Sequence, residues 1–548
     1  MTQPPTTTVR TTAEALVDGL LAHGVDAVFG LPGVQTYPLF EALAAAGDRI
    51  ELFGARHEQA CAYMAFGYAQ ATGRVGVCSV VPGPGVLNAS AGLLTAYGAS
   101  IPVLCLTSEI PTAYLGRGLG HLHEMPDQLA SLRSFTKWAA NVLSPAMAPG
   151  LLDEAMFQAQ SGRPGPTALA APWDVLPMRT DVDPPHPRER RSPPIDQEGF
   201  QRAAGLIRQA KRPMILVGGG ARHAAAQVRA LAALLQAPTV SFRSGRGVVS
   251  DDDTLGLNCA EGFQLWPDTD LLLAIGSRQE LAWFRWPDRP ADLVTINLDI
   301  DPMQQVRLRP TVALTADAAE GAAHLLTLLG DCEPDPARLE PIHAARERAR
   351  EGYDGLQPHL DYLAAVSDVL GPSGYLVEEI CQVGFASYFG YPVREPRHFI
   401  TAGGQGTLGF GVPTALGVKA ARRSEPVVAL AGDGGFMFGV QELATAVQHR
   451  LGVVFVLFDN NAYGNVKADQ QRLYGRPAGS DLTNPDFVAL TRSFGADAYT
   501  VTDPAGLRPV LDAALAKDHP AVIHIRMPLD PSSSPWRFIM PASRQQAG

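Results

Sequence analysis

The chain has 548 residues, of which 46% are hydrophobic and 18% are charged, and its formal net charge at pH 7 is −11. This composition excludes a disordered chain and a collagen-like chain, and the length predicts three to four domains at roughly 150 residues each. The acidic balance disfavours a general nucleic-acid binder, because such proteins are normally basic.

The amino-terminal segment and the cysteines indicate a cytoplasmic protein. Residues 1–12 (MTQPPTTTVRTT) are polar and contain no apolar core, so we expect no secretory signal. No stretch of about 18 apolar residues occurs, so no membrane span is expected either. The six cysteines include no CxxC pair, which favours reduced thiols over a disulfide framework.

Two Pro-rich, charged stretches, residues 176–199 and 331–360, are predicted linkers. They separate an amino-terminal domain (1–175), a central domain (200–330) and a carboxyl-terminal domain (361–548). Each domain alternates short apolar strands with amphipathic helical runs, which is typical of doubly wound parallel sheets. We therefore predict an α/β fold with three such sheets, whose ligands bind beyond the carboxyl ends of the strands.

In the amino-terminal domain, the segment after the second predicted strand is the most informative. Strands are expected at residues 25–30, 49–54, 75–81 and 101–108. Arg56, His57 and Glu58 follow the second of these, and a helix is expected over 59–73. Taken alone, Glu58 is compatible with an ordinary acidic residue in the first turn of a helix, where the helix dipole favours negative charge.

The central and carboxyl-terminal domains repeat this alternation. Central strands are expected at residues 212–220, 237–242, 269–277 and 293–301. Carboxyl-terminal strands are expected at residues 397–402, 427–434, 452–460 and 521–527. The second and third of the latter set enclose one helical run over 436–450, so they form one βαβ unit with a right-handed crossover.

The polar residues at the ends of these two strands predict a metal and phosphate site. Asp433 follows Gly432 at the end of one strand, and Asp459 and Asn460 end the next. Carboxylate and amide oxygens suit Mg²⁺ or Ca²⁺ rather than zinc. Gly434 and Gly435 let the backbone approach a phosphate at a helix N-terminus; a plain Gly-rich turn with an Asp cap is the alternative.

This loop resembles the cofactor motif of thiamine-diphosphate enzymes, in the form found in the acetolactate-synthase-like branch. The residues that carry the resemblance are GDG at 432–434 and NAYGNVK at 461–467. The resemblance implies Mg²⁺ bound by the side chains of Asp433 and Asn460 and by the backbone oxygen of Ala462. The cofactor contacts that it implies in this loop also include Gly432, Gly434, Gly435, Tyr463 and Gly464. Asp459 departs from the pattern, which has Asn at this place.

Further motifs extend the resemblance over roughly residues 10 to 530. RHEQACAYMAFGYAQATG (56–73) resembles the pyrimidine-binding domain of the family, where the glutamate hydrogen-bonds N1′ of the aminopyrimidine. Glu58 is thereby the implied activator of the cofactor. AGGQGTLGFGVPTALG (402–417) resembles the loop in which Gly406 accepts a hydrogen bond from the 4′-amino group and Leu408 holds the cofactor bent. In this family the two parts of the site meet between subunits, which implies a homodimer or homotetramer.

The substrate side matches the synthases less well. The central-domain sequence GSRQEL at 276–281 lacks the RFDD-type segment of the synthases, so FAD is expected to be absent. His123 stands where the synthases have Gln, and is a candidate to protonate the decarboxylated product or bind a carboxylate; an ordinary loop histidine is the alternative. Candidate substrate contacts are Val34, His121, His123, Gln128, Asn465 and Asp469. The last two replace a Met and a Trp of the synthases.

Together these motifs favour an enzyme that decarboxylates a 2-oxo acid and transfers the acyl group to a carbonyl acceptor, as acetolactate synthases do. Glu58 and His123 are its candidate catalytic residues. A simple 2-oxo acid decarboxylase, an FAD-containing oxidase and a non-catalytic cofactor-binding homologue are the alternatives. Only small molecules and other copies of the chain are expected as partners.

Overall fold

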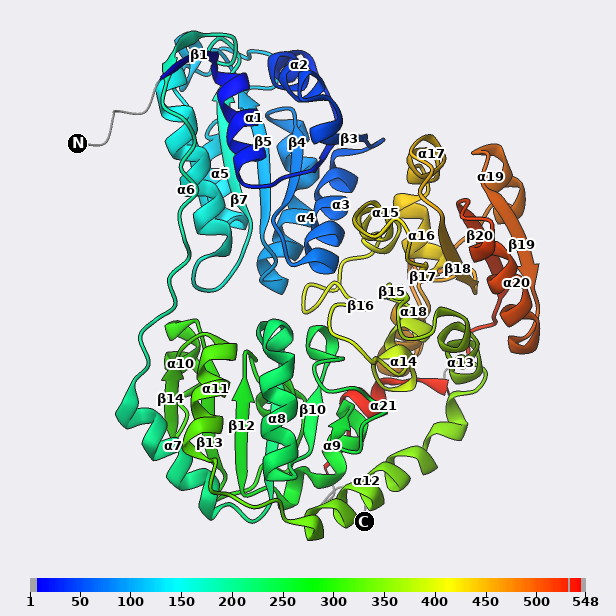
Figure 1. Cartoon of the computed structure of the whole chain (residues 1–548). Coiled ribbons are helices and arrows are strands. Elements are labelled where there is room, and N and C mark those ends of the chain that lie inside the picture. Colours follow the sequence, from blue (N-terminus) through cyan, green and yellow to red (C-terminus); the bar gives the residue numbers. More distant parts are fainter. Residues whose placement is uncertain (1–6, 531–532, 544–548) are drawn as a thin grey trace.

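The computed structural model describes residues 7–530 and 533–543, and it contains three separate six-stranded sheets (Figure 1). Every strand pair within these three sheets is parallel, and helices flank each sheet. The predicted α/β class with three doubly wound parallel sheets is therefore confirmed.

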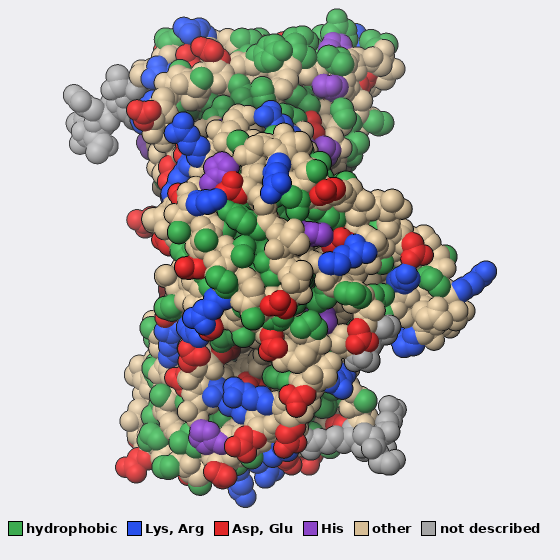
Figure 2. All heavy atoms as spheres, turned by 90° about the vertical axis from the view of Figure 1, so that its right-hand side faces the viewer, with side chains coloured by type: hydrophobic (Ala, Val, Ile, Leu, Met, Phe, Trp, Pro, Cys, Tyr) green, Lys and Arg blue, Asp and Glu red, His purple; other side chains and the backbone are tan. Residues whose placement is uncertain are grey.

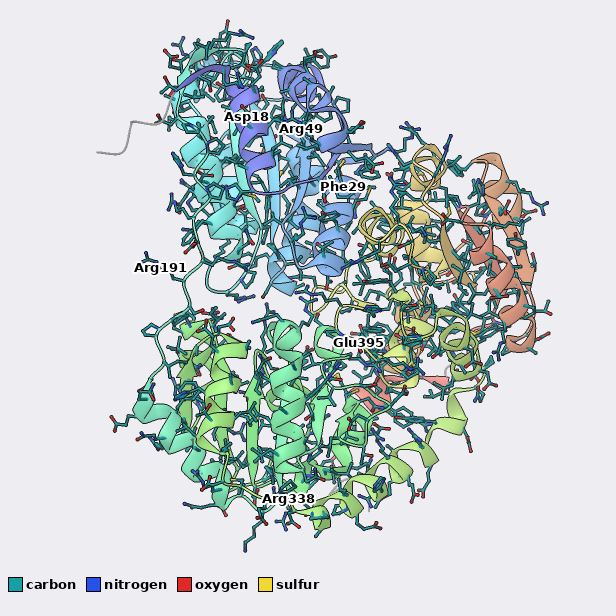
Figure 3. All side chains as sticks on the ribbon, in the orientation of Figure 1. Asp18, Phe29, Arg49, Arg191, Arg338 and Glu395 are labelled. Atoms are coloured by element: carbon teal, nitrogen blue, oxygen red, sulfur yellow. The ribbon has the colours of Figure 1, made fainter. Side chains whose placement is uncertain are left out.

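The amino-terminal sheet has the strand order β3-β2-β4-β5-β7-β6. Its strands are β2 (Ala27–Gly30), β3 (Glu51–Gly54), β4 (Gly76–Val80), β5 (Val103–Glu109), β6 (Trp138–Asn141) and β7 (Thr167–Pro172). Its helices are α1 (Thr12–Ala22), α2 (Tyr37–Ala45), α3 (Glu58–Thr72), α4 (Pro84–Ala99), α5 (Gln128–Phe135) and α6 (Ala148–Gln160). Phe29, labelled in Figure 3, is fully buried in β2, as expected for a strand covered on both faces.

The predicted linker 176–199 does not begin as a free segment. Its first part forms β8 (Arg179–Val182), which pairs antiparallel with β1 (Thr8–Thr11) beside the amino-terminal domain. The chain then runs past Arg191 down to the central domain, along the left edge of Figure 3. Only Val182 among the four residues of β8 is apolar, so no alternating pattern distinguishes this strand from a linker in the sequence.

The central sheet has the strand order β11-β10-β9-β12-β13-β14. Its strands are β9 (Pro213–Val217), β10 (Thr239–Ser241), β11 (Gly256–Leu257), β12 (Leu271–Ile275), β13 (Val294–Asp299) and β14 (Val312–Thr315). Its helices are α7 (Gln197–Gln209), α8 (Ala225–Leu235), α9 (Cys259–Leu265), α10 (Pro302–Leu308) and α11 (Ala318–Leu328). The second predicted linker carries α12 (Leu339–Glu351), which leads toward the third domain.

The carboxyl-terminal sheet has the strand order β16-β15-β17-β18-β20-β19. Its strands are β15 (Tyr375–Val377), β16 (Phe399–Ile400), β17 (Val427–Gly432), β18 (Val453–Asp459), β19 (Asp497–Val501) and β20 (Ala521–Arg526). Its helices are α13 (His359–Leu370), α14 (Gln382–Gly390), α15 (Gly411–Ala421), α16 (Asp433–Gly439), α17 (Glu442–Gln448), α18 (Gly464–Tyr474), α19 (Phe487–Ser493) and α20 (Pro504–Ala516). Because β17 and β18 are neighbours, Gly432 lies beside Phe458, so the two predicted ligand strands end together.

The amino- and carboxyl-terminal domains pack through α3 and α15. A Cβ at Gly67 would lie 2.2 Å from the backbone oxygen of Thr414, and one at Gly417 would lie 1.9 Å from that of Met64. The two helices can approach this closely only because both positions are glycine. This contact fixes α3, and with it Glu58 at its first position, relative to the carboxyl-terminal sheet.

The described part of the carboxyl-terminal tail packs on the body of the molecule. In α21 (Trp536–Ile539), the Trp536 ring lies 4.8 Å from that of Phe385. The ring of Phe538 contacts that of Phe389 in a tilted arrangement, with 5.0 Å between ring centroids. Glu395, labelled in Figure 3, joins the carboxyl-terminal and central domains by accepting a 3.2 Å hydrogen bond from Arg229.

The distribution of surface charge and the lengths of the helices concern the nucleic-acid and membrane partners that the sequence disfavours. On the face shown in Figure 2, the described acidic and basic side chains are interspersed rather than gathered by sign. No helix within the described residues is long and apolar enough to cross a membrane.

Candidate functional site

Glu58 begins α3 at the carboxyl edge of the amino-terminal sheet. His57 caps this helix, its Nδ1 accepting a 3.2 Å hydrogen bond from the backbone N–H of Gln59. The Oε2 of Glu58 accepts a 3.0 Å hydrogen bond from Asn88 Nδ2, on α4. Glu58 is half-buried.

The carboxyl-terminal domain holds the turn that precedes Glu58. The backbone N–H of Arg56 donates to both carboxylate oxygens of Glu442 in α17, at 3.2 and 3.1 Å. Thr445 donates to the same carboxylate at 2.6 Å. Burial raises the pKa of Glu442. Glu442, which is far from Arg56 in the sequence, thus fixes the backbone that immediately precedes α3.

His123 lies beside the glycine turn near Glu58. Its backbone oxygen is 2.4 Å from the position that a Cβ at Gly83 would take, and its Nδ1 lies 3.1 Å from Gln35 Oε1. Its φ of 65° is unusual for a residue other than glycine, and such strain is often retained at functional sites. Val34 starts the short turn that contains Gln35. His121 stacks on Tyr114, with 5.1 Å between ring centroids.

Gln128 makes internal hydrogen bonds. Its Oε1 accepts from the backbone N–H of Gly83 at 2.7 Å, and its Nε2 donates to Ser108 O at 2.8 Å and to Glu109 Oε2 at 3.1 Å. The side chain is buried, and its hydrogen bond from Gly83 supports the glycine turn. Its predicted contact with substrate stays a prediction.

The three predicted metal ligands converge. The backbone N–H of Ala462 lies 3.3 Å from Asp433 Oδ2 and 3.1 Å from Asn460 Oδ1. Asp433 is buried, and burial raises its pKa, as does the neighbouring Asp459. A divalent cation would relieve both effects, so this oxygen-rich donor set fits Mg²⁺. Within the described residues there is no cluster of three His, Cys, Asp or Glu side chains of the kind that holds zinc.

Asp459, which departs from the family pattern, is held by side chains of the adjacent strand β20. Its Oδ2 accepts hydrogen bonds from Arg526 at 2.7 Å and His524 at 3.1 Å, both on β20. These partners help to lower the pKa of Asp459 against the opposing effect of burial. The carboxylate that replaces the usual amide is therefore compensated by the Arg526 guanidinium and a hydrogen bond from His524, both on the adjacent strand.

Asn484 is a member of this site that the sequence analysis missed. Its Nδ2 lies 2.7 Å from Asp433 Oδ2, 2.9 Å from Asp459 Oδ1 and 3.1 Å from Asn461 Oδ1. The residue comes from the loop before α19, where no motif marks it. Only its position between the two strand ends reveals it.

The other predicted cofactor residues surround this loop. A Cβ at Gly434 would lie 2.5 Å from Tyr463 Cε1, and one at Gly464 would lie 2.8 Å from Asn460 Nδ2, so the glycines allow close packing here. Gly406 is exposed with a φ of 58°, and Leu408 is half-buried.

Two candidate substrate contacts lie on α18, none of whose residues is buried. Asn465 is half-buried near the start of this helix. Asp469 lies farther along and is exposed, with a 3.0 Å salt bridge to Arg472. Their contact with substrate stays a prediction.

A cavity of about 660 Å³ lies at the carboxyl edge of the central sheet, where it meets the other two domains. Its lining includes the arginines Arg163, Arg222, Arg243, Arg278 and Arg397. Burial lowers the pKa of Arg222 to about 9 and that of Arg278 to about 10. Arginines nevertheless outnumber the acidic residues of the lining, which are Glu280, Asp299, Asp317 and Glu320, so the cavity favours anions. The expected absence of FAD stays a prediction.

Two buried glutamates, Glu378 and Glu379, follow β15 and were also missed. Each is fully inaccessible to solvent, and burial raises the pKa of Glu378 to about 7 and that of Glu379 to about 8. Strand β15 has three residues, too few to predict from the sequence, so nothing marked these carboxyl groups as lying at a strand end.

Replacing Glu378 by Gln is expected to stabilise the protein at alkaline pH. Its pKa is about 7 in the fold against 4.5 unperturbed, so the folded state keeps a proton that the unfolded state loses between these values. Glu378 therefore lowers the free energy of unfolding as pH rises through this window, by up to about 3 kcal/mol, and Gln does not. Thermal denaturation of both proteins at about pH 5 and about pH 8 measures the difference.

Glu347→Gln, at an exposed position on α12, is the matched control. Its melting temperature should differ from that of the parent by the same amount at both pH values. If the melting temperatures of Glu378→Gln and the parent differed by the same amount at both pH values, the prediction would be contradicted.

Comparison with known proteins adds three family models and many relatives. Residues 10–131 match the N-terminal TPP binding domain of thiamine pyrophosphate enzymes, residues 200–325 match their central domain, and residues 380–525 match their C-terminal TPP binding domain. A probable 2-ketoarginine decarboxylase of Pseudomonas aeruginosa is 35% identical, over 94% of this chain and 94% of its own length. The acetolactate synthase isozyme 2 large subunit of Escherichia coli is 32% identical, over 97% of this chain and 98% of its own. The acetolactate synthase large subunit of Parasynechococcus marenigrum is 32% identical, over 94% and 87%.

Proposed function

Because this chain belongs to the thiamine pyrophosphate enzyme family, in its acetolactate synthase-like part, we propose that it decarboxylates a 2-oxo acid with thiamine diphosphate and Mg²⁺. The observation that carries the proposal is the convergence of Asp433, Asn460 and Ala462 at the ends of two neighbouring strands. Glu58, at the edge of another sheet, supplies the second half of the site.

The metal loop would hold the diphosphate end of the coenzyme. Asp433 and Asn460 supply side-chain oxygens to Mg²⁺ and Ala462 supplies its backbone oxygen. Gly434 and Gly435 lie in the first turn of α16, where backbone N–H groups and the helix dipole favour phosphate. Asn484 holds Asp433 in place by the 2.7 Å hydrogen bond to its Oδ2.

Glu58 would hold a proton at N1′ of the aminopyrimidine. Its Oε2 is bound to Asn88, so we assign its Oε1 to this contact. When bound, the coenzyme supplies a nucleophilic carbon and accepts the electron pair left by departing CO₂. The role of the chain is to place this group, to exclude water and to control the proton at N1′.

We infer that the product is released as an aldehyde. His123 sits beside the glycine turn next to Glu58, held by Gln35, and is placed to donate the proton that replaces CO₂ on the former carbonyl carbon. The 35% identity to a protein named as a 2-ketoarginine decarboxylase supports the same outcome and suggests a cationic side chain on the substrate. Asp469, exposed on α18, is a candidate to attract such a side chain.

Carboligation, the reaction that the motifs alone favoured, is the second candidate. The relatives named as acetolactate synthases are 28–32% identical over almost the whole chain, which supports it. The two reactions share the decarboxylation and differ in whether a proton or a second carbonyl compound meets the acyl group.

Two copies of the chain would complete the site. Leu87, Leu94 and Tyr97 on α4 are 51%, 41% and 44% exposed, and Met437 and Phe438 on α16 are 38% and 49% exposed. Large apolar side chains exposed on these helices favour burial in a subunit interface. We therefore propose at least a homodimer in which Glu58 of one copy faces Asp433 of the other.

The test is incubation of the purified protein with 2-oxo acids that carry apolar, acidic or guanidino side chains, with identification of the products. CO₂ release with an aldehyde as the sole organic product is expected, most strongly with the guanidino compound, and only when thiamine diphosphate and Mg²⁺ are present. A hydroxyketone product would favour carboligation. If the protein released CO₂ from none of these acids, both candidate reactions would be rejected.

A further inference from the structure

The carboxyl group of Glu379 joins the end of β15 to the loop that carries Gly406 and Leu408. Its Oε1 accepts a 3.0 Å hydrogen bond from the backbone N–H of Gly409, and its Oε2 accepts a 2.8 Å hydrogen bond from that of Gly411. Both oxygens are therefore used, and both partners lie at the end of this loop. The side chain is fully buried, so water does not compete for these bonds.

The space for this carboxyl group is made by glycines. A Cβ at Gly411 would lie 2.6 Å from Glu379 Oε2, and a Cβ at Gly435 would lie 3.1 Å from Glu379 Cδ. Gly435 belongs to the first turn of α16, which begins at Asp433. Glu379 thus contacts both the loop proposed to hold the aminopyrimidine and the helix proposed to hold the diphosphate.

The loop needs such an anchor because of its own sequence. Gly403, Gly406 and Gly409 have φ values of 67°, 58° and 80°, and glycine in these conformations loses much entropy on ordering. Residues 404–406 are exposed. The Gly403 N–H donates to Thr401 Oγ1 at 3.1 Å, and the Thr407 hydroxyl lies 3.2 Å from that of Thr95.

We propose that Glu379 is a positioning residue, which fixes Gly406 and Leu408 against the coenzyme by accepting hydrogen bonds from Gly409 and Gly411. The proposal rests on the proposed function, since these two loop residues matter only if the coenzyme binds there. Glu379 acts through the loop and does not itself touch the reacting atoms.

The neighbouring Glu378 provides a matched comparison. Its Oε1 accepts hydrogen bonds from Thr401 Oγ1 at 2.5 Å and from Tyr388 OH at 3.1 Å, whereas its Oε2 has no partner among the described residues. Glutamine at 378 can keep both hydrogen bonds through its single oxygen. Glutamine at 379 can keep only one, because its amino group would face the second backbone N–H as another donor.

The experiment compares Glu379→Gln, Glu378→Gln and the parent as full-length proteins freed of coenzyme. Calorimetric titration with thiamine diphosphate in excess Mg²⁺, at about pH 8.5 so that both carboxyl groups are mostly ionised and each substitution removes the same charge, gives the dissociation constants. Glu379→Gln is expected to bind at least about 10-fold more weakly and to lose most of the near-ultraviolet circular dichroism change on binding. Glu378→Gln is expected to stay within about twofold of the parent. Equal binding by Glu379→Gln and the parent, or equal losses in both variants, would overturn the proposal.

Hydrogen–deuterium exchange on the unmodified protein tests the same idea without a substitution that could prevent folding. The amides of Gly409 and Gly411 are expected to exchange slowly and those of residues 404–406 rapidly, even without coenzyme. Rapid exchange at Gly409 and Gly411 would refute the anchor. If the unmodified protein bound no coenzyme while these two amides were protected, the proposed function would fail and the anchor itself would stand.

Discussion

Replacement of Glu58 by glutamine is expected to lower the rate of CO₂ release at saturating coenzyme by about 10²- to 10⁴-fold, the usual contribution of a positioned acid–base group. Glutamine keeps the size of the side chain and keeps an oxygen that can accept from Asn88 Nδ2. It cannot hold and return a proton at N1′. Coenzyme affinity, measured by calorimetry in the presence of Mg²⁺, should change much less than turnover, since the metal loop is untouched.

Glu51→Gln is the matched control for this substitution. Glu51 lies on the strand before the same turn, is exposed, and forms a salt bridge with Arg423 on the surface. Its replacement should leave both turnover and coenzyme affinity near those of the parent. Full activity in Glu58→Gln would contradict the proposed mechanism, irrespective of the result for Glu51→Gln.

Replacement of Asp433 by asparagine is expected to weaken Mg²⁺-dependent binding of thiamine diphosphate by at least about 100-fold. The change keeps the shape of the side chain but removes the buried negative charge that a divalent cation would neutralise. Because Asp459 is already engaged by Arg526 and His524, it should not take over as the metal ligand. Calorimetric titration with and without a chelator measures the effect.

Asp481→Asn provides the corresponding control. Asp481 lies across from Ala462 in an isolated β-bridge and forms a 2.5 Å salt bridge with Lys467, yet it is exposed. Its carboxylate is close to the metal loop in the fold but faces solvent. Binding in Asp481→Asn should stay within a few-fold of the parent. Unchanged binding in Asp433→Asn would show that the metal is held elsewhere.

The convergence of the predicted metal ligands could be foreseen because these residues are close in the sequence. Asp433 and Asn460 end consecutive strands of one βαβ unit, and a right-handed crossover between neighbouring parallel strands brings such ends together. The apolar runs of β17 and β18 are long enough to identify as buried strands. Glu58 could be located relative to its strand and helix for the same reason, although its role came from the family resemblance.

The residues that the sequence analysis missed share a different property. Asn484 and Glu379 reach the site from a loop and from a three-residue strand, neither of which has a recognisable pattern. The contact between Glu442 and Arg56 joins two domains. Gln128, a predicted substrate contact, makes three internal hydrogen bonds that the sequence did not reveal, and its contact with substrate stays a prediction.

The amino-acid sequence by itself determined the α/β class and the three parallel sheets. These follow from local periodicity, since the burial of a strand or of a helix face depends on residues a few positions apart. The tertiary structure alone decided which carboxylates are partly accessible to solvent, as Glu58 is, and which are fully buried, as Glu378 and Glu379 are. That division depends on contacts between segments hundreds of residues apart, which desolvate one carboxyl group and leave another open, and no local pattern encodes them.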